Sequence, residues 1–214
     1  MEIFSDWPDN FLLFLPGLGV TLALTFWSLA FGLPLGVLLA LSSLSKRAVV
    51  RTATMAIVEF GRGVPALVLL YLIYFGLPQV DIVLPAFAAA VVGLGFSTGA
   101  YTSEIVRGGI RSISSTQGEA AFALAMTPRQ AMARVILPQA LRHVIPPLVG
   151  FSVLLYQATS LAYAISVPEL LSKAYSVASI TFAFASCFLL AGVMYAVLSI
   201  TVSVLVNGRA AKRA

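Results

Sequence analysis

The sequence has few charged residues and almost no residues that bind metals. Only 10% of its 214 residues are Asp, Glu, Lys or Arg, and 60% are hydrophobic. A soluble domain of this size would need more polar residues to cover its surface, so the composition excludes one. One histidine, His143, and one cysteine, Cys187, exclude an internal disulfide and leave no cluster with metal-ligand spacing. There is no Gly-x-x-x-x-Gly-Lys-Ser/Thr loop for nucleotide phosphates. The sequence therefore predicts no enzyme, no metal and no cofactor.

The apolar runs are long enough to cross a membrane. About 20 consecutive apolar residues span a bilayer as a helix. The first run is too long for a signal peptide and follows acidic rather than basic residues, so we expect it to be retained. We predict an all-α integral membrane protein, a single transmembrane domain over residues 1–214, with a cytoplasmic loop at about 104–141. Its bundle of five transmembrane helices is expected at 11–44, 52–77, 82–103, 141–166 and 180–206.

The net charge of +5 comes from basic residues that cluster in alternate loops. This placement favours a membrane orientation over binding to nucleic acid. By the positive-inside rule the loops after the first, third and fifth spans are cytoplasmic, with the N-terminus outside and the C-terminus inside. Only Lys173 lies in an opposite-side loop. The residues that carry the argument are Lys46, Arg47, Arg51, Arg107, Arg111, Arg129, Arg134, Arg142, Arg209, Lys212 and Arg213.

The loop at about 104–141 is expected to form two short helices. Thr116 with Glu119, and Thr127 with Gln130, have the spacing of capping boxes, which predicts a helix break near Met126. The first helix is rich in alanine, so another protein could approach its backbone closely. The segment is therefore either a helix that docks on a partner protein or an interfacial helix that lies on lipid headgroups.

The same loop carries a motif. Glu119-Ala120-Ala121 opens it and Val135-Ile136-Leu137-Pro138 closes it. This spacing resembles the EAA loop of ABC importer permeases, with Ala125 in place of a glycine and Val135 in place of an isoleucine. The resemblance implies a cytoplasmic two-helix coupling loop that docks on ATPase subunits, and it favours the docking interpretation. The coupling residues it implies are Glu119, Ala120, Ala121, Ala125, Thr127, Leu137 and Pro138.

Further segments resemble the permeases for polar amino acids, of the histidine, glutamine and arginine type. The resemblance implies two permease subunits, two ATP-binding cassette subunits and an extracytoplasmic solute-binding protein in the bacterial cytoplasmic membrane. It leaves open which amino acid or related solute is carried. The segments are Gly17 to Leu22 with Thr25, Arg62 to Pro65, Tyr71 to Pro78, Ala100 to Ile110 and Val167 to Leu171.

A helix of the second span is interrupted by Gly61, Gly63 and Pro65. Arg62 in this break must face protein, water or a partner charge, because a charge at bilayer depth costs about 2.5 to 3.5 kcal/mol. Such a break is tolerated where it lines a cavity or is buried in protein. Arg62 is thus a candidate for the translocation path, while the favoured interpretation is a structural ion pair with Glu59. Glu104 with Arg107 is expected to form a similar pair.

The fourth span carries a polar cluster that can line a solute path or bond to other helices. In the related permeases that hold the solute, this span commonly carries charges at the positions of Phe151, Gln157 and Ala158, and none is present here. We favour a heterodimer in which a different permease holds the solute. The alternative is a solute that needs no carboxylate ligand. The path candidates in the cluster are Tyr156, Gln157, Thr159 and Ser160.

The function expected from these features is that of a permease subunit in an ATP-driven importer for polar amino acids or related small solutes. A self-powered secondary carrier or channel is the main alternative, but no repeat or proton-relay cluster is present. A membrane scaffold that transports nothing is a third, and it would not require a broken helix or polar residues at depth.

Overall fold

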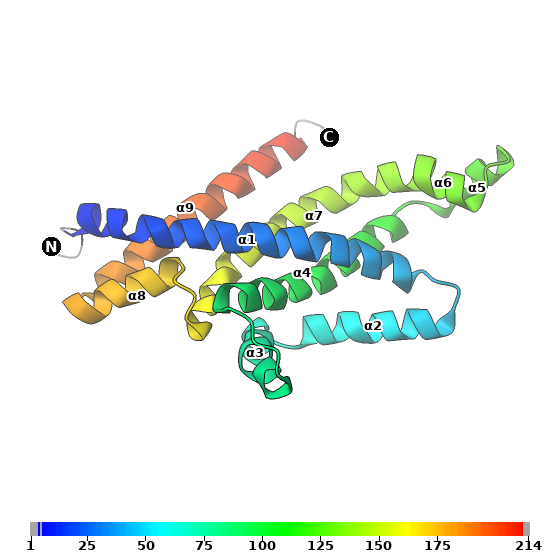
Figure 1. Ribbon diagram of the computed structural model, residues 1–214. Coiled ribbons are helices and arrows are strands. Elements are labelled where there is room, and N and C mark those ends of the chain that lie inside the picture. The colour runs from blue at the N-terminus through cyan, green and yellow to red at the C-terminus, as the bar shows by residue number, and fades with distance from the viewer. Residues whose placement is uncertain (1–3, 5, 212–214) are drawn as a thin grey trace.

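The protein is a bundle of helices. The computed structural model describes residues 4 and 6–211, and of 206–211 only the helical backbone. Within this part of the chain every regular element is helical, which confirms the all-α class. Four long helices form the body of the bundle (Figure 1): α1 (Trp7–Ser43), α4 (Ala86–Arg111), α7 (Leu137–Ala158) and α9 (Phe184–Ala211). The side chain of Arg209, and Lys212 and Arg213, which entered the orientation argument, lie outside the described residues.

Not every expected span has the length and composition of a membrane helix. Among the described residues three stretches do: Trp7–Ser43, Pro128–Ile165 and Phe184–Leu205. A fourth exists if α2 (Ala48–Gly63) and the helical stretch Ala66–Val80 form one span, although they meet at an angle of 104°. Helix α4 has 26 residues, enough to cross a bilayer, but many of them are Gly, Ala, Ser or Thr. The count of five spans therefore stays a prediction.

Helices α1 and α4 pack together through small residues. Gly32 and Gly36 on α1 face the α4 backbone so closely that an added Cβ atom would lie 2.6 Å from the Gly95 oxygen and 2.7 Å from the Gly99 oxygen, respectively. Small residues at this spacing let two helix backbones approach each other. The buried small residues of α1 continue the same stripe at Ser28, Gly32, Gly36 and Ala40.

Prolines explain the irregular helical turns. Pro65 forces Val64 into an extended conformation (φ −82°, ψ 129°), so α2 ends at Gly63 and α3 (Ala66–Tyr71) starts in a new direction. Two π-helical turns, η1 (Leu72–Gly76) and η3 (Met132–Ile136), each end two residues before a proline, Pro78 and Pro138. A proline has no N–H for the i→i−4 bond, and a wider turn accommodates the missing partner. Pro146 and Pro147 lie inside α7.

One helix was not predicted. Helix α8 (Leu170–Thr181) lies between a 3₁₀ segment, η4 (Thr159–Ile165), and α9. Its buried residues Leu170, Ala174 and Ala178 recur every four residues, as on one face of a helix. With 12 residues, the helix is too short to be predicted as a membrane span. At the same end of the bundle lies the described start of α1, opposite α5 (Ser115–Ala123) and α6 (Pro128–Ala131) (Figure 1).

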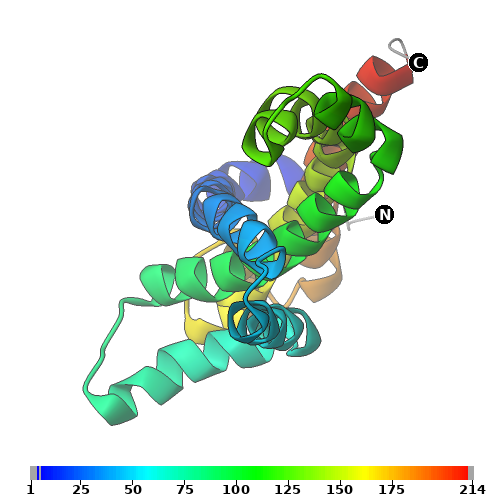
Figure 2. The ribbon, with the colours of Figure 1, turned by 90° about the vertical axis from the view of Figure 1, so that its right-hand side faces the viewer.

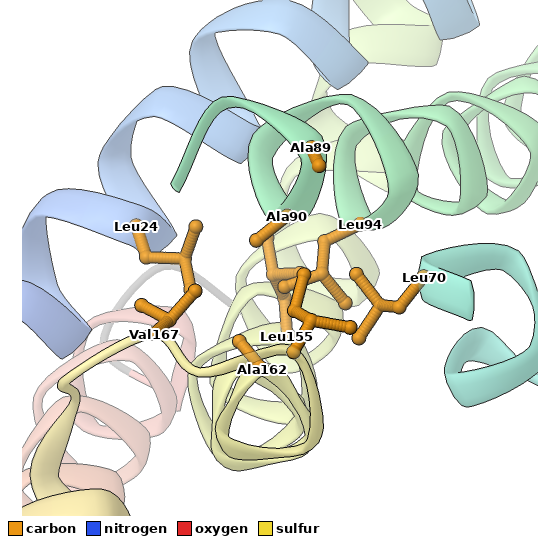
Figure 3. Packing of buried hydrophobic residues seen from close by; sticks show 9 residues of the cluster. Leu24, Leu70, Ala89, Ala90, Leu94, Leu155, Ala162 and Val167 are labelled. Atoms are coloured by element: carbon orange, nitrogen blue, oxygen red, sulfur yellow. The ribbon is translucent and has the colours of Figure 1, made fainter. Parts of the chain in front are cut away.

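Of three clusters of buried side chains, the two larger hold most of the helices together. The first joins α1, α3, α4 and α7 around Leu24, Leu70, Leu94 and Leu155 (Figure 3). The second joins α1, α8 and α9 and includes Phe14 and the free Cys187. The segment from α3 to η2 (Leu77–Val80) projects with the start of α4 to one side of the bundle (Figure 2).

Replacing Gly32 by alanine is expected to lower the free energy of unfolding by about 1–3 kcal/mol, because the new methyl group overpacks the contact between α1 and α4. Thermal unfolding in detergent measures the effect. Gly19→Ala is the matched control, since an added Cβ there meets nothing within 4 Å and alanine favours the helix. Equal melting temperatures for the two variants would contradict the packing argument.

Candidate translocation cleft and coupling segment

The expected two-helix loop is present, with one change in its caps. Helix α5 ends at Ala123 and α6 starts at Pro128, which confirms the predicted break. The second capping box is also confirmed: the Thr127 Oγ1 accepts from the Gln130 N–H at 3.3 Å and Gln130 Oε1 accepts from the Thr127 N–H at 2.9 Å. The first is wrong, because Ser114 caps α5 and accepts from the N–H of Thr116. Thr116 therefore lies two residues beyond the cap, inside the first turn of α5.

Ala125 lies two residues after the end of α5, in a conformation that favours glycine. Its φ of 55° is left-handed, which costs a residue with a Cβ atom roughly 1–2 kcal/mol. The N–H of Met126 donates to the Ala121 oxygen at 3.1 Å and the N–H of Ala125 to the Phe122 oxygen at 2.9 Å. This is the Schellman arrangement, and Ala125 holds the position that glycine usually takes.

Residues 115–136, which form the candidate coupling segment, expose one face and bury the other. Ala121 is buried with Ala131, and the Gln139 side chain of α7 donates to Gln117 of α5 at 3.3 Å. The segment is thereby fixed to the start of α7. Its outer face carries two large apolar side chains, Phe122 and Leu124. Of the predicted coupling residues, Ala121 alone points inward, and the exposed ones are Glu119, Ala120, Ala125, Thr127, Leu137 and Pro138.

A cleft of about 430 Å³ opens beside the break in the second span. Its walls come from three elements: the end of α2 with the Gly63 to Ala66 break, α4 and α7. Gly61 allows α2 to approach α4, since an added Cβ would lie 2.7 Å from the Cβ of Ala100. This contact brings Arg62 beside Tyr101. The cleft is lined by Arg62, Gly63, Val64, Pro65, Ala66, Leu94, Ser97, Thr98, Tyr101, Phe151, Leu154, Leu155 and Ala158.

The two ion pairs expected from the sequence are both present and are joined. Arg62 Nη1 lies 3.6 Å from a carboxylate oxygen of Glu59, and Arg107 Nε donates to Glu104 at 2.9 Å. Arg62 Nη1 also lies 3.6 Å from Glu104 Oε2, which links α2 to α4. The Arg62 guanidinium carbon stands 5.6 Å from the centre of the Tyr101 ring. The pair of Arg62 with Glu104 was not predicted from the sequence, because it depends on the packing of α2 against α4.

The polar cluster of the fourth span lies away from the cleft. Gln157 Nε2 donates to Ser199 of α9 at 3.2 Å, and buried Thr159 donates to the Tyr156 carbonyl at 2.6 Å. Ser160 donates to the Gln157 carbonyl at 2.8 Å. Tyr156 lines a smaller hollow of about 160 Å³ between α1, α7 and α9. Of the predicted path residues, the structure places Arg62 alone on the cleft wall.

Glu169 is a buried carboxylate that the sequence argument did not single out. It caps α8, accepting from the N–H groups of Leu171 at 2.8 Å and Ser172 at 2.7 Å, and it accepts from the Tyr195 hydroxyl of α9 at 2.7 Å. Burial raises the pKa of the Glu169 carboxyl, and these three donors oppose the rise. Pro168-Glu169 before an apolar run was the available signal. The carboxylate ties α8 to α9.

The described residues contain no group of three or more His, Cys, Asp and Glu side chains that could hold a metal ion.

Residues 32–211 match the family described as "Binding-protein-dependent transport system inner membrane component". This chain belongs to that family. As a permease subunit, this inner membrane component is not itself catalytic.

Relatives of this inner membrane component are named as amino-acid permeases. It is 40% identical over 181 residues to the probable amino-acid ABC transporter permease protein PatM of Vibrio harveyi, covering 83% of this chain and 81% of PatM. It is also 40% identical to the L-cystine transport system permease protein TcyB of Bacillus subtilis, over 74% of this chain and 68% of TcyB. These relatives confirm the resemblance to ABC importer permeases of the amino-acid type.

Solved structures agree with the fold of this inner membrane component. The crystal structure of an amino acid ABC transporter with histidines superposes with a TM-score of 0.91 at 33% identity, covering 95% of both chains. The inward-facing MetNI methionine ABC transporter gives a TM-score of 0.69 at 23% identity, over 92% of this chain and 96% of that chain. At that identity, the second likeness shows the fold alone.

Replacing Ala125 by glycine is expected to stabilise the end of α5 by about 1 kcal/mol, because glycine adopts the left-handed conformation without a steric penalty. Hydrogen exchange of the Ala125 and Met126 amides should slow roughly fivefold. Ala120→Gly, inside the same helix, is the control and should speed exchange. Unchanged exchange in the Ala125 variant would show that the position is not strained.

Proposed function

We propose that this chain is the transmembrane permease subunit of an ATP-driven importer for polar amino acids or related small solutes. The observation that carries the proposal is the family match together with relatives named as amino-acid ABC transporter permeases. The assembly contains two permease subunits, two ATP-binding cassette subunits that hydrolyse ATP, and an extracytoplasmic solute-binding protein. The chain forms one permease domain over residues 1–214, with its coupling loop at about 104–141.

The coupling segment acts as a docking site for an ATPase subunit. Helix α6, the π-helical turn η3, α7 and η4 form one helical stretch, Pro128–Ile165, that runs from the coupling segment to the cleft wall at Phe151 and Ala158. Gly109 of α4 packs so closely on Val144 of α7 that an added Cβ would lie 2.2 Å from a methyl carbon. Movement of the docked segment is thereby carried to α4 and α7 together, which alternates access to the cleft.

The cleft beside Arg62 forms this subunit's part of the translocation path. The polar cluster Tyr156, Gln157, Thr159 and Ser160 supports the path by holding the end of α7 in place. Gln157 bonds to Ser199 and Tyr156 packs on Tyr195, both on α9, and Thr159 and Ser160 bond to backbone carbonyls of α7. Phe151 and Ala158 present apolar surface to the cleft. This supports a heterodimer in which the second permease, a different homologue, supplies further polar contacts. A pair of identical chains is the alternative.

The basic loops place the coupling segment in the cytoplasm and the N-terminus outside. The described start of α1 and the helix α8 lie at one end of the bundle, and α5 and α6 lie at the other (Figure 1). The five predicted spans put the C-terminus on the side opposite the N-terminus, in the cytoplasm. The chain thus resides in the bacterial cytoplasmic membrane as a multi-pass protein, in contact with lipid.

Native mass spectrometry of the tagged chain, purified gently with its partners, tests the composition. We expect two ATPase subunits, one copy of this chain and one distinct permease. Two copies of this chain with the ATPases would overturn the heterodimer but keep the importer. Failure of any ATPase to purify with the chain, under conditions that preserve other membrane complexes, would favour a secondary carrier or channel.

Replacing Glu119 by lysine is expected to lower ATP-driven uptake at least tenfold, because it reverses an exposed charge on the docking face of α5. Uptake into proteoliposomes and ATP hydrolysis are measured together, and hydrolysis should no longer follow uptake. Glu119→Asp keeps the charge and should retain most of the activity. Membrane insertion should be the same for both variants, and normal uptake by the lysine variant would contradict the coupling role.

A further inference from the structure

The cleft beside the broken helix is lined by one positive charge and by no negative charge. Among the residues that line it, Arg62 is the only one with a charged side chain. Glu59 and Glu104 pair with Arg62 but do not line the cleft. A solute in the cleft therefore meets one cation and no carboxylate. A cationic side chain placed there would be repelled by Arg62 and would find no carboxylate among the lining residues.

The protein does not use all the hydrogen-bond donors of Arg62. A guanidinium has five N–H donors in a planar fork. Both ion pairs of Arg62 use Nη1, and at 3.6 Å each is longer than a hydrogen bond. Nε is buried and has no hydrogen-bond partner among the described residues. Glu104 is held chiefly by Arg107, which contacts both of its carboxylate oxygens.

Free guanidinium donors suit a carboxylate. Arginine and a carboxylate form paired N–H···O bonds that are about twice as strong as bonds between neutral groups. Tyr101 stacks against one face of Arg62 and limits its motion, since its ring lies 5.6 Å from the guanidinium carbon and its hydroxyl donates to the Arg62 carbonyl at 3.5 Å. Arg62 lines the cleft, and a carboxylate bound there would meet the guanidinium donors that the two ion pairs do not use.

The α7 wall of the cleft is apolar. Tyr101 and Phe151 stack with ring centres 5.1 Å apart at 25°, and Leu154 and Ala158 continue the surface along α7. A volume of about 430 Å³ is in the range of small-molecule sites. An uncharged side chain gains contact there, and a charged one loses water without finding a partner.

We propose that this cleft binds the carboxylate of a zwitterionic amino acid with an uncharged side chain, through Arg62, and excludes amino acids with cationic side chains. The assignment rests on the proposed function and names the solute class of its cleft. The second permease of the assembly contributes the remaining contacts, including the acceptor for the amino group.

Direct binding to the purified permease–ATPase assembly, without the binding protein, tests the assignment. The probes are tritiated L-leucine, L-glutamine and L-arginine, with L-leucinamide as a competitor that lacks the carboxylate. We expect leucine or glutamine to bind at least tenfold more tightly than arginine, and leucinamide to compete poorly. Arg62→Gln should weaken binding of the neutral amino acid at least tenfold. Tighter binding of arginine, or no binding of either neutral probe, would overturn the assignment.

Three further variants separate a binding role from a structural one. Arg51→Gln removes an exposed arginine near the other end of α2, which does not line the cleft or join its ion network, and should leave affinity within about twofold. Ala158→Asp adds a carboxylate to the wall and should tighten arginine binding at least tenfold, whereas Ala158→Asn should not. This gain remains measurable if Arg62→Gln does not assemble. Arginine affinity that is the same in both Ala158 variants would contradict the proposal.

The outcomes also distinguish this assignment from the transport function. Loss of the ATPase from the assembly, or uptake that does not need ATP, would overturn the importer proposal. ATP-driven uptake together with unchanged neutral amino-acid binding by Arg62→Gln would leave the importer intact and overturn only the solute class.

Discussion

The close contact between α1 and α4 is the constraint on which the rest of the molecule depends. Glycines at 32, 36, 95 and 99 remove the side chains that would hold the two backbones apart. In a membrane, where lipid is as apolar as leucine, such packing is a main force between helices. Helix α4 also contacts α2 and α7, so its position on α1 decides where Tyr101 and Glu104 stand. The cleft and its ion network exist because this contact is tight.

Features that depend on neighbouring residues could be predicted from the sequence. The capping box of Thr127 and Gln130, the helix break near Met126 and the pairs of Arg62 with Glu59 and of Glu104 with Arg107 need only local geometry. The family followed from spacing in the coupling loop. Composition alone excluded a soluble domain. The five-span count goes beyond local geometry, because α4 consists largely of small residues and its role comes from packing rather than from apolarity.

Features that depend on distant segments could not be predicted. Arg62 meets Glu104 only because Gly61 lets α2 lie against Ala100, a contact between residues far apart in the chain. Gln157, Thr159 and Ser160 look like a path lining because they are polar residues within an apolar span, yet all three bond to the protein itself. Helix α8 was missed because its buried stripe is short. A polar residue in a span therefore predicts a hydrogen bond more securely than it predicts a solute.

The unbroken helical stretch from Pro128 to Ile165 makes the protein sensitive to helical phase. Each residue added to an α-helix turns everything beyond it by about 100°. A single insertion or deletion between α6 and Phe151 would rotate the proposed docking face relative to the cleft while leaving the composition of both surfaces intact. The π-helical turn before Pro138 already holds one such extra residue within a helix. The number of residues in this helical stretch therefore determines how its two ends are oriented relative to each other, whichever side chains they carry.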